Sequence, residues 1–278
     1  PRQVAGFFVC GTILCKFLYE TFLEKTKGNR MKNILKLLSI SSLMISFIFG
    51  QEKTLYQGRL WHPKPMQGDK MEDGMAKKTK KYNVGNDNYT MYSFRVLTGE
   101  NQGAVLRVSP KTYSERDKYP LRQAEIDYFQ KNVIPYADMT KDKGTSLWLE
   151  VDGQDYNGSG NNERLRYRQV IEYLIQPGKL GEWNELREEL VAAHKKAGSK
   201  ARFSHFNRIS GGKTHLIHMI VPFDSWKDYG NLVPIFSVDI YNKAHGKGQH
   251  KKWLDRVSKI IQYRKAYIRE FLPELSTD

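Results

Sequence analysis

One pattern of strands and helices occurs twice after residue 51, and this repeat limits the fold more than any other feature of the sequence. In the second copy, residues 164–178 mix Val, Ile and Tyr and end at Pro177-Gly178, which is typical of a strand. Apolar residues then recur every three or four positions over 180–193, which predicts a helix buried on one face. Two strands around Gly211-Gly212 and another helix from 224 complete this copy. The first copy follows the same order more weakly, with a strand at 54–61, a helix at 68–82, a hairpin at 89–110, a helix at 121–134 and a strand at 145–151.

The ends of the two hairpins are also alike. In each, a proline is followed by a segment in which Ser precedes Asp by three residues, a helix-start signature. The two serines, Ser114 and Ser225, are 111 residues apart, which is about one small domain. A polar segment rich in Gly and Asn lies between the copies and indicates a linker. The sequence therefore divides into a first module at 51–151, a linker at 152–163, a second module at 164–242 and a C-terminal segment at 243–278.

The β-α-β-β pattern, with YLIQPGKLGEWNEL in its strand and helix and VPFDSWKDY at the end of its hairpin, resembles the dimeric α/β-barrel superfamily, most nearly its NIPSNAP-like members. The resemblance covers 164–232 well and 54–151 loosely. It implies an α+β fold of ferredoxin-like modules whose sheets pair face to face around a pocket. Two such modules in one chain would form a tandem pseudo-dimer, and the chain could also form a homodimer. Relatives include cofactor-free monooxygenases, haem-dependent enzymes and proteins without known activity, so haem is a candidate cofactor.

The C-terminal segment predicts a long basic helix that follows a connector at 245–252 and stops near Pro273. The residues at helical spacing are Trp253, Val257, Ile260, Ile261, Arg264, Ile268 and Phe271. The basic residues that could meet an anionic polymer or surface are Lys251, Lys252, Arg256, Lys259, Arg264 and Lys265.

The first fifty residues look like a leader. Two lysines precede an uncharged apolar run at 37–49 and a small residue follows it, which is the layout of a signal peptide at 31–50. Residues 1–30 are an upstream extension of the reading frame or a leading segment, with a membrane anchor as the alternative if they are genuine. Both cysteines lie in this part, so 51–278 has no disulfide and no cysteine ligand. We therefore expect 51–278 to be exported.

The charge and the missing motifs narrow the functions further. Residues 1–50 hold seven Lys/Arg and two Asp/Glu, so 51–278 keeps a formal net charge of +10. Such a surface attracts polyanions, although nucleic acid is not expected as the partner of an exported protein. The sequence has no phosphate-binding glycine loop, no nucleophile elbow and no His-Glu-x-x-His motif, which argues against the sites that those motifs build.

The second hairpin is the best candidate for a site, because it holds three of the seven histidines. A two-residue turn at Gly211-Gly212, or a four-residue loop at 210–213, would pair His205 with His218 and place Asn207 on the same side. His215 would then point to the opposite face. We therefore expect His205, His218 and Asn207 to form the catalytic group, with histidine as a general base or an iron ligand.

The strand at 168–175 should lie beside the strand that carries His218, as the first and third strands of a ferredoxin-like module do. Glu172 and Tyr173 point to opposite faces, so one of them borders the histidine pair. Glu172 would favour metal or haem binding or proton transfer, whereas Tyr173 would favour an aromatic-lined organic pocket. Periodicity does not choose between them, and two histidines without a fixed third ligand do not define a metal site.

The first hairpin offers a different set of side chains. Alignment of the two hairpins puts Arg95 and Leu106 where the histidines stand, so a histidine site is confined to the second half. Tyr92, Phe94 and Arg107 could line the mouth of a site for an acidic or aromatic ligand. The function we expect is the binding of a small organic ligand between sheet faces, with oxygenase-like chemistry as its enzymatic form. The alternatives are a binding module for an anionic polymer and a structural pseudo-dimer without a pocket.

Overall fold

The structure is a computed structural model that describes residues 52–85, 89–118, 122–161, 163–230 and 237–277. The expected leading segment at 1–30 and signal peptide at 31–50 lie outside these residues. Among the residues described, no helix is both long enough and apolar enough to cross a membrane.

The first half alternates strands and helices in the order that the sequence predicts. Its elements are β1 (Thr54–Trp61), α3 (Gly68–Tyr82), β2 (Tyr92–Val96), β3 (Val105–Thr112), α4 (Tyr113–Asp117), α5 (Gln123–Asn132) and β4 (Thr145–Glu150). Two 3-10 turns, Ile134–Tyr136 and Met139–Lys141, lead from α5 into β4. The strands lie side by side in the order β4-β1-β3-β2, and all of these pairs are antiparallel.

The second half repeats this arrangement with additional helices. Its elements are β6 (Tyr167–Ile175), α6 (Leu180–Ala197), β7 (Arg202–Ser210), β8 (Leu216–Phe223), α7 (Trp226–Gly230), α8 (Val238–His245), α9 (Gln249–Ile260) and β9 (Ile261–Phe271), with a last 3-10 turn at Pro273–Leu275. The strands follow the order β9-β6-β8-β7, again antiparallel. The linker at 152–163 contributes a short strand, β5 (Tyr156–Asn157), which pairs with β7.

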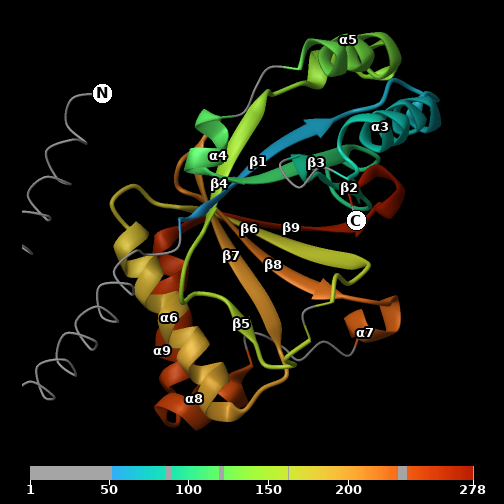
Figure 1. Ribbon diagram of the computed structural model, residues 1–278. Coiled ribbons are helices and arrows are strands. Elements are labelled where there is room, and N and C mark those ends of the chain that lie inside the picture. The colour runs from blue at the N-terminus through green and yellow to red at the C-terminus, as the bar shows by residue number, and fades with distance from the viewer. Residues whose placement is uncertain (1–51, 86–88, 119–121, 162, 231–236, 278) are drawn as a thin grey trace, which may run out of the picture. The chain divides into compact units, whose positions relative to one another are not determined.

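The strands of the two halves join into a closed ring. On one side β2 pairs with β9, and on the other side β4 pairs with β7, so the order β4-β1-β3-β2-β9-β6-β8-β7 returns to its start (Figure 1). Closure leaves neither half with an open edge strand at these two seams, where unpaired backbone groups would invite aggregation. The resulting barrel is the frame on which every side chain of the candidate site is placed.

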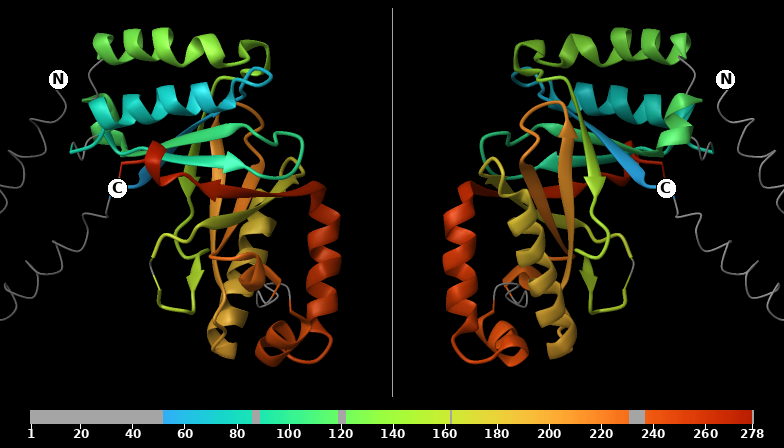
Figure 2. Two further views of the ribbon diagram at one scale, coloured as in Figure 1. Left: turned by 90° about the vertical axis from the view of Figure 1, so that its right-hand side faces the viewer. Right: turned by 90° about the vertical axis from the view of Figure 1, so that its left-hand side faces the viewer.

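Helices cover the outside of the barrel in two groups (Figure 2). The helices α3 and α5 cover the sheet of the first half, where Trp61, Met71 and Met75 belong to one apolar core. The helices α6, α8 and α9 cover the sheet of the second half around a larger core that includes Trp183 and Trp253. Because neighbouring residues of a strand point to opposite faces, the residues between these outward ones point into the barrel.

The helix α6 follows the pattern in its sequence closely. Glu182 lies in its first turn and the basic residues lie in its last turn, which complements the helix dipole. Gly198 ends the helix in the left-handed conformation, at a φ of 65°, and its N–H group bonds to the carbonyls of His194 and Lys195. The polarity of the charges and the glycine stop were both readable in the sequence.

The prediction of one long C-terminal helix is wrong. The helix α9 ends at Ile260, and residues 261–271 form β9, which lies between β6 and β2. Ile261, Arg264 and Ile268 are spaced as in a helix, but the segment is also rich in β-branched and aromatic residues, which favour a strand. The segment forms a strand because its backbone pairs with the backbones of β6 and β2.

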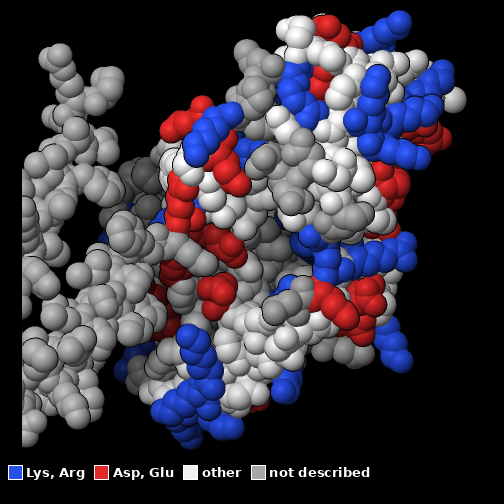
Figure 3. Space-filling view, in the orientation of Figure 1, with Lys and Arg blue, Asp and Glu red and all other residues white. Residues whose placement is uncertain are grey.

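The expected basic helix is divided by this change. Arg264 and Lys265 belong to β9, and Lys265 lies 3.3 Å from the carboxylate of Glu100. On α9, Arg256 forms an ion pair with Glu189 at 2.7 Å. Figure 3 shows that acidic side chains interrupt the basic ones over the face in view. The basic residues of this segment therefore do not lie along one helix, although Lys251, Lys252 and Lys259 are exposed on α9.

Candidate functional site

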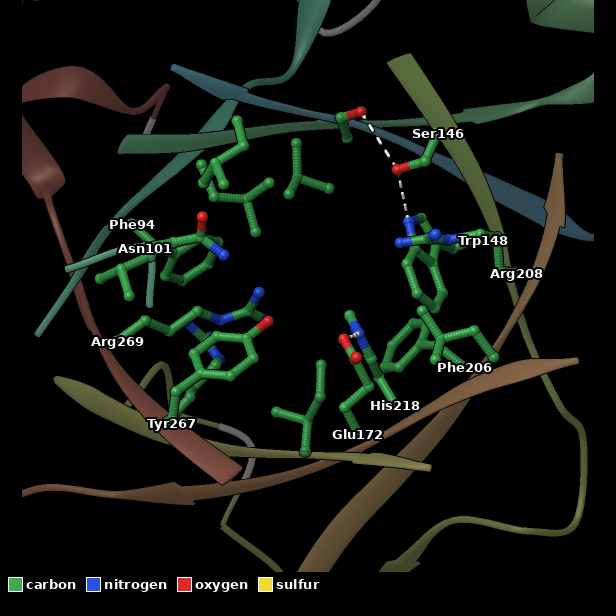
Figure 4. A pocket seen from close by; sticks show the side chains of 18 of the residues that line it. Phe94, Asn101, Ser146, Trp148, Glu172, Phe206, Arg208, His218, Tyr267 and Arg269 are labelled. Carbon is green, nitrogen blue, oxygen red and sulfur yellow. Dashed lines mark hydrogen bonds and ion pairs between the residues drawn. The ribbon is translucent and has the colours of Figure 1, made fainter. Parts of the chain in front are cut away.

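The interior of the barrel holds a cavity of about 1200 Å³. Inward-pointing residues of every strand of the closed ring line it, from both halves of the chain. In Figure 4, Trp148 and Arg208 lie on one side of the cavity and Phe94 and Arg269 on the other, with His218 nearer Trp148. The volume is sufficient for a drug-sized organic molecule, and the mixture of aromatic walls with a few polar groups is typical of ligand sites.

The hairpin of β7 and β8 forms as predicted, but its register differs by one residue. His205 pairs with Met219, and His218 pairs with Phe206. The connection between the strands occupies 211–215 instead of two residues. Because a shift of one residue turns one strand's side chains to the other face, the predicted pair of His205 and His218 does not exist.

His205 and Asn207 lie on the outer face of the hairpin, away from the cavity. His205 is only 1% exposed, and its Nδ1 lies 2.5 Å from the carbonyl oxygen of Gln154, to which it donates a hydrogen bond. Burial and the nearby charge of Arg187 lower the pKa of His205 to about 3, so its ring is neutral. Asn207 accepts a hydrogen bond from Arg187 at 3.3 Å. Both residues belong to the packing between the sheet and α6, and the prediction that they join His218 in a site is wrong.

His218 faces the cavity and is paired across the sheet with Glu172. Its Nε2 lies 3.1 Å from Oε2 of Glu172, and the hydroxyl of Tyr263 donates to Oε1 of the same carboxylate at 3.0 Å. The indole of Trp148 stacks on the imidazole with a centroid distance of 4.0 Å. The structure thus selects Glu172, and not Tyr173, as the neighbour of the cavity histidine.

The protonation states follow from these contacts. Burial lowers the pKa of His218, and this effect outweighs the opposing influence of Glu172, so the imidazole is neutral near pH 7. Burial by itself would raise the pKa of Glu172, but the hydrogen bonds from His218 and Tyr263 and the charge of Arg208 lower it overall, so the carboxylate is ionised. An ionised carboxylate only accepts hydrogen bonds. Nε2 of His218 therefore carries the proton, and Nδ1 keeps its lone pair.

The other residues expected at the site are divided between the two faces. Tyr173 points to the helical side, where its ring lies 4.9 Å from that of Trp183, and burial raises its pKa to about 12. Tyr92 lines the cavity. Arg107 does not: it is buried beside α3 and donates to the hydroxyl of Thr79 at 2.5 Å. Because Ser93 is the partner of Arg107 across the hairpin, both residues point away from the face that carries Tyr92.

The sequence did not single out several residues that line the cavity. Those with a direct relation to the candidate site are Trp148, Arg168, Arg208, Tyr263, Tyr267 and Arg269. The strand that carries Trp148 was identified, but nothing in its pattern shows that it pairs with β7. Tyr263, Tyr267 and Arg269 were missed because the sequence pattern assigned their segment to a helix.

The donor set fits a haem poorly. The described residues contain no group of three or more His, Cys, Asp or Glu side chains that could hold a metal ion. The nitrogen of His218 that lies far from the backbone, Nε2, is held by Glu172, and Trp148 covers one face of the ring. The remaining nitrogen, Nδ1, is next to the side chain's own Cβ, which crowds the approach of a broad macrocycle. We therefore derive no step that uses haem.

The fold is that of a dimeric α/β barrel with ferredoxin-like strand order. A proposed monooxygenase from Lactobacillus acidophilus superimposes with a TM-score of 0.52 and 8% identity, over 81% of this chain and 96% of the other. A proposed monooxygenase from Fusobacterium nucleatum gives a TM-score of 0.53 and 10% identity, over 80% and 94% of the two chains. An anthrone oxidase-like protein gives 0.50 and 11%, over 80% and 92%. No sequence-family model and no curated protein sequence matches the chain. At these identities the similarity concerns the fold alone.

Proposed function

We propose that the protein binds a small aromatic compound inside the barrel and removes a proton from it with His218, as a cofactor-free oxygenase-like enzyme. One observation carries this proposal: a neutral histidine, oriented by the carboxylate of Glu172 through Nε2, lines a large cavity with aromatic walls. A histidine backed by a carboxylate is a common general base, and its tautomer is fixed by that partner.

The reaction that suits this arrangement begins with an acidic O–H or C–H bond of the ligand. Nδ1 of His218 accepts the proton, and Glu172 stabilises the imidazolium that forms. The resulting delocalised carbanion or phenolate is electron-rich and can transfer electrons to dioxygen without a metal. The fold similarity to proposed monooxygenases and to an anthrone oxidase-like protein favours this class of chemistry.

The proposal also includes the module organisation of the chain, its oligomeric state and its export. The equal strand order of the two halves supports their description as tandem ferredoxin-like modules of a pseudo-dimer. A closer relation to NIPSNAP-like proteins and the formation of a homodimer remain predictions from the sequence. Export is likewise a prediction from residues 31–50. The cavity argues against a purely structural pseudo-dimer, and the divided basic residues argue against an anionic polymer as the main partner.

Anthrone provides a direct test, because one anthrone and one dioxygen yield anthraquinone and water. We expect the full chain to accelerate dioxygen uptake and the appearance of anthraquinone, and His218→Gln to slow turnover by about 100-fold or more. His215→Gln is the matched control, since this histidine lies in the same hairpin outside the cavity lining and should retain the rate. A His218→Gln variant as fast as the unaltered protein would rule out the proposed base. Absence of both turnover and anthrone-induced quenching of tryptophan fluorescence would count against this substrate type.

A further inference from the structure

Two arginines stand side by side in the wall of the cavity. Arg168 on β6 and Arg269 on β9 are direct cross-strand partners, so their side chains leave the sheet on the same face. Both line the cavity. Each guanidinium carbon lies 4.5 Å from the centre of the Phe94 ring, which is thus shared between the two cations. Like charges placed directly opposite on neighbouring strands are destabilising, so this pair requires an explanation.

Neither arginine has an anionic partner within the part of the chain that the structure describes. Arg269 is 6% exposed, and its Nε is buried without a hydrogen-bond acceptor. Nη1 of Arg168 is likewise buried without a hydrogen-bond acceptor. The carboxylate of Glu270 points outward and pairs with Arg166 at 2.7 Å. The carboxylate of Glu172 is already held by the side chains of the histidine site.

Arg107 and Arg187 also leave a buried Nε without an acceptor, but other nitrogens of their guanidinium groups do have partners, and several further arginines are paired with carboxylates. Arg59, Arg95 and Arg256 each form an ion pair with a carboxylate. Even buried arginines that have no carboxylate partner find protein oxygens: Arg107 bonds to Thr79, and Arg187 bonds to the side-chain oxygen of Asn184 at 2.7 Å. An unpaired buried charge is costly, and buried charges in proteins are normally paired. Arg168 and Arg269 therefore form a place in the cavity wall where binding of an external anion would be favourable.

The geometry also sets the length of a ligand that reaches both sites. Arg168 and Glu172 are four residues apart on one strand, which corresponds to about 13 Å along β6. Arg269 and His218 are their respective neighbours on the flanking strands. One benzene ring is too short to bridge this distance, whereas two or three fused rings with polar groups at their ends match it. The space between is lined by Phe94, Tyr267, Phe206 and Trp148, which suit a flat aromatic body.

We infer that the ligand is a polycyclic aromatic carboxylate, with its carboxylate bound by Arg168 and Arg269 and its acidic hydrogen presented to His218 at the opposite end. The inference rests on the proposed function for the role of His218, whereas the anion site rests on the two arginines alone. A guanidinium presents parallel N–H donors that match a carboxylate, so two of them around one carboxylate give both strength and orientation.

A matched pair of probes tests the anion site. The full chain is titrated by calorimetry with 6-hydroxy-2-naphthoate and with the neutral 6-hydroxy-2-naphthamide, which differ only in the charged group. We expect the carboxylate to bind at least about 10-fold more tightly than the amide, since hydrogen bonds to a charged group are the stronger kind. Arg168→Gln and Arg269→Gln should each reduce that preference to below about 2-fold and leave the affinity for the amide nearly unchanged. Arg166→Gln removes the same charge from the outer face and should preserve the preference.

The ligand-free protein supplies a second readout that a merely structural pair would not give. Arg168→Met removes one of two repelling buried cations and keeps an apolar stem, so we expect its melting temperature to rise while naphthoate binding weakens. A fall in melting temperature would show that the fold depends on this cation, and would overturn the inference.

The outcomes separate the inference from the proposed function. Equal binding of the amide and the carboxylate, with His218→Gln still impairing turnover, overturns the anion site and leaves the base in place. A clear preference for the carboxylate that Arg168→Gln abolishes, with turnover unaffected by His218→Gln, supports the anion site and removes the base. Binding of neither probe overturns the anion site, and the anthrone assay with His218→Gln then decides on the base alone.

Discussion

The two faces of the β7–β8 hairpin each carry one histidine, fully buried on the outer face and partly exposed on the inner face, and their surroundings give the two residues different properties. On the outer face, His205 lies among side chains of α6 and donates to a backbone carbonyl. On the inner face, His218 meets a carboxylate, an indole and a cavity. Burial lowers the pKa of both. A depressed pKa therefore does not identify a functional histidine here. The difference is that His218 lines the large cavity and His205 does not.

The largest expected effect is the loss of stability when each histidine is replaced by alanine. His205→Ala removes a fully buried ring and leaves the carbonyl of Gln154 without its donor, so we expect the free energy of unfolding to fall by about 2–4 kcal/mol. His218→Ala borders a cavity already and should cost about 1 kcal/mol. Urea unfolding followed by circular dichroism measures both. A larger loss for His218→Ala than for His205→Ala would reverse the assignment of core and cavity faces.

The pH dependence of stability sharpens the same comparison. The fold holds the pKa of His205 near 3, below the value of 6.5 that is usual for histidine, so the fold favours the neutral ring. The contribution of His205 is therefore complete above pH 6.5 and is lost as the pH falls from 6.5 towards 3, with a slope of about 1.4 kcal/mol per pH unit. His218 acts in the same direction. In urea unfolding at several pH values, His205→Gln should have a shallower slope than the unaltered protein. An unchanged slope would show that His205 is not the group that titrates.

The smallest effect concerns Asn207, which the sequence grouped with the histidines. Asn207→Ala removes one hydrogen bond from Arg187 on the outer face, and we expect a loss of about 1 kcal/mol in the free energy of unfolding. Anthrone turnover and naphthoate affinity should be unchanged, because the residue does not line the cavity. The comparison with Ser204→Ala, on the inner face of the same strand, controls for a general weakening of β7. Impaired turnover in Asn207→Ala alone would return this residue to the site.

The sequence was sufficient for most of the architecture because the signals involved are local. Strand alternation, helical spacing and glycine stops identified β6, α6 and both hairpins within a few residues. The strand β9 was missed because Ile261, Arg264 and Ile268 fit a helical period, and the choice depends on β2 and β6, which lie far away in the chain. A local sequence pattern contains no information about strand partners that are so far away in the chain.

The site was predicted less well, since one residue of register determines which side chains meet. Gly211-Gly212 suggested a two-residue turn, but Gly211 packs directly on the backbone of β4. A Cβ atom added at Gly211 would lie 2.2 Å from the carbonyl oxygen of Thr145. The contact with β4 thus occurs together with a connection longer than two residues and with the shifted register between β7 and β8. His218 and Glu172 nevertheless lie beside each other, because their strands are neighbours in either register.

The position of β9 has a consequence for how the protein is made. This strand follows all the others in the described chain, yet it lies between β6 and β2 and supplies Tyr263, Tyr267 and Arg269 to the cavity. During synthesis the helices and hairpins of both halves can form early, but the walls of the cavity are incomplete until residue 271 has left the ribosome. A nascent or truncated chain that lacks β9 therefore exposes the edges of β2 and β6 and has no closed interior. Closure of the barrel and protection of these two edges are thus the same event.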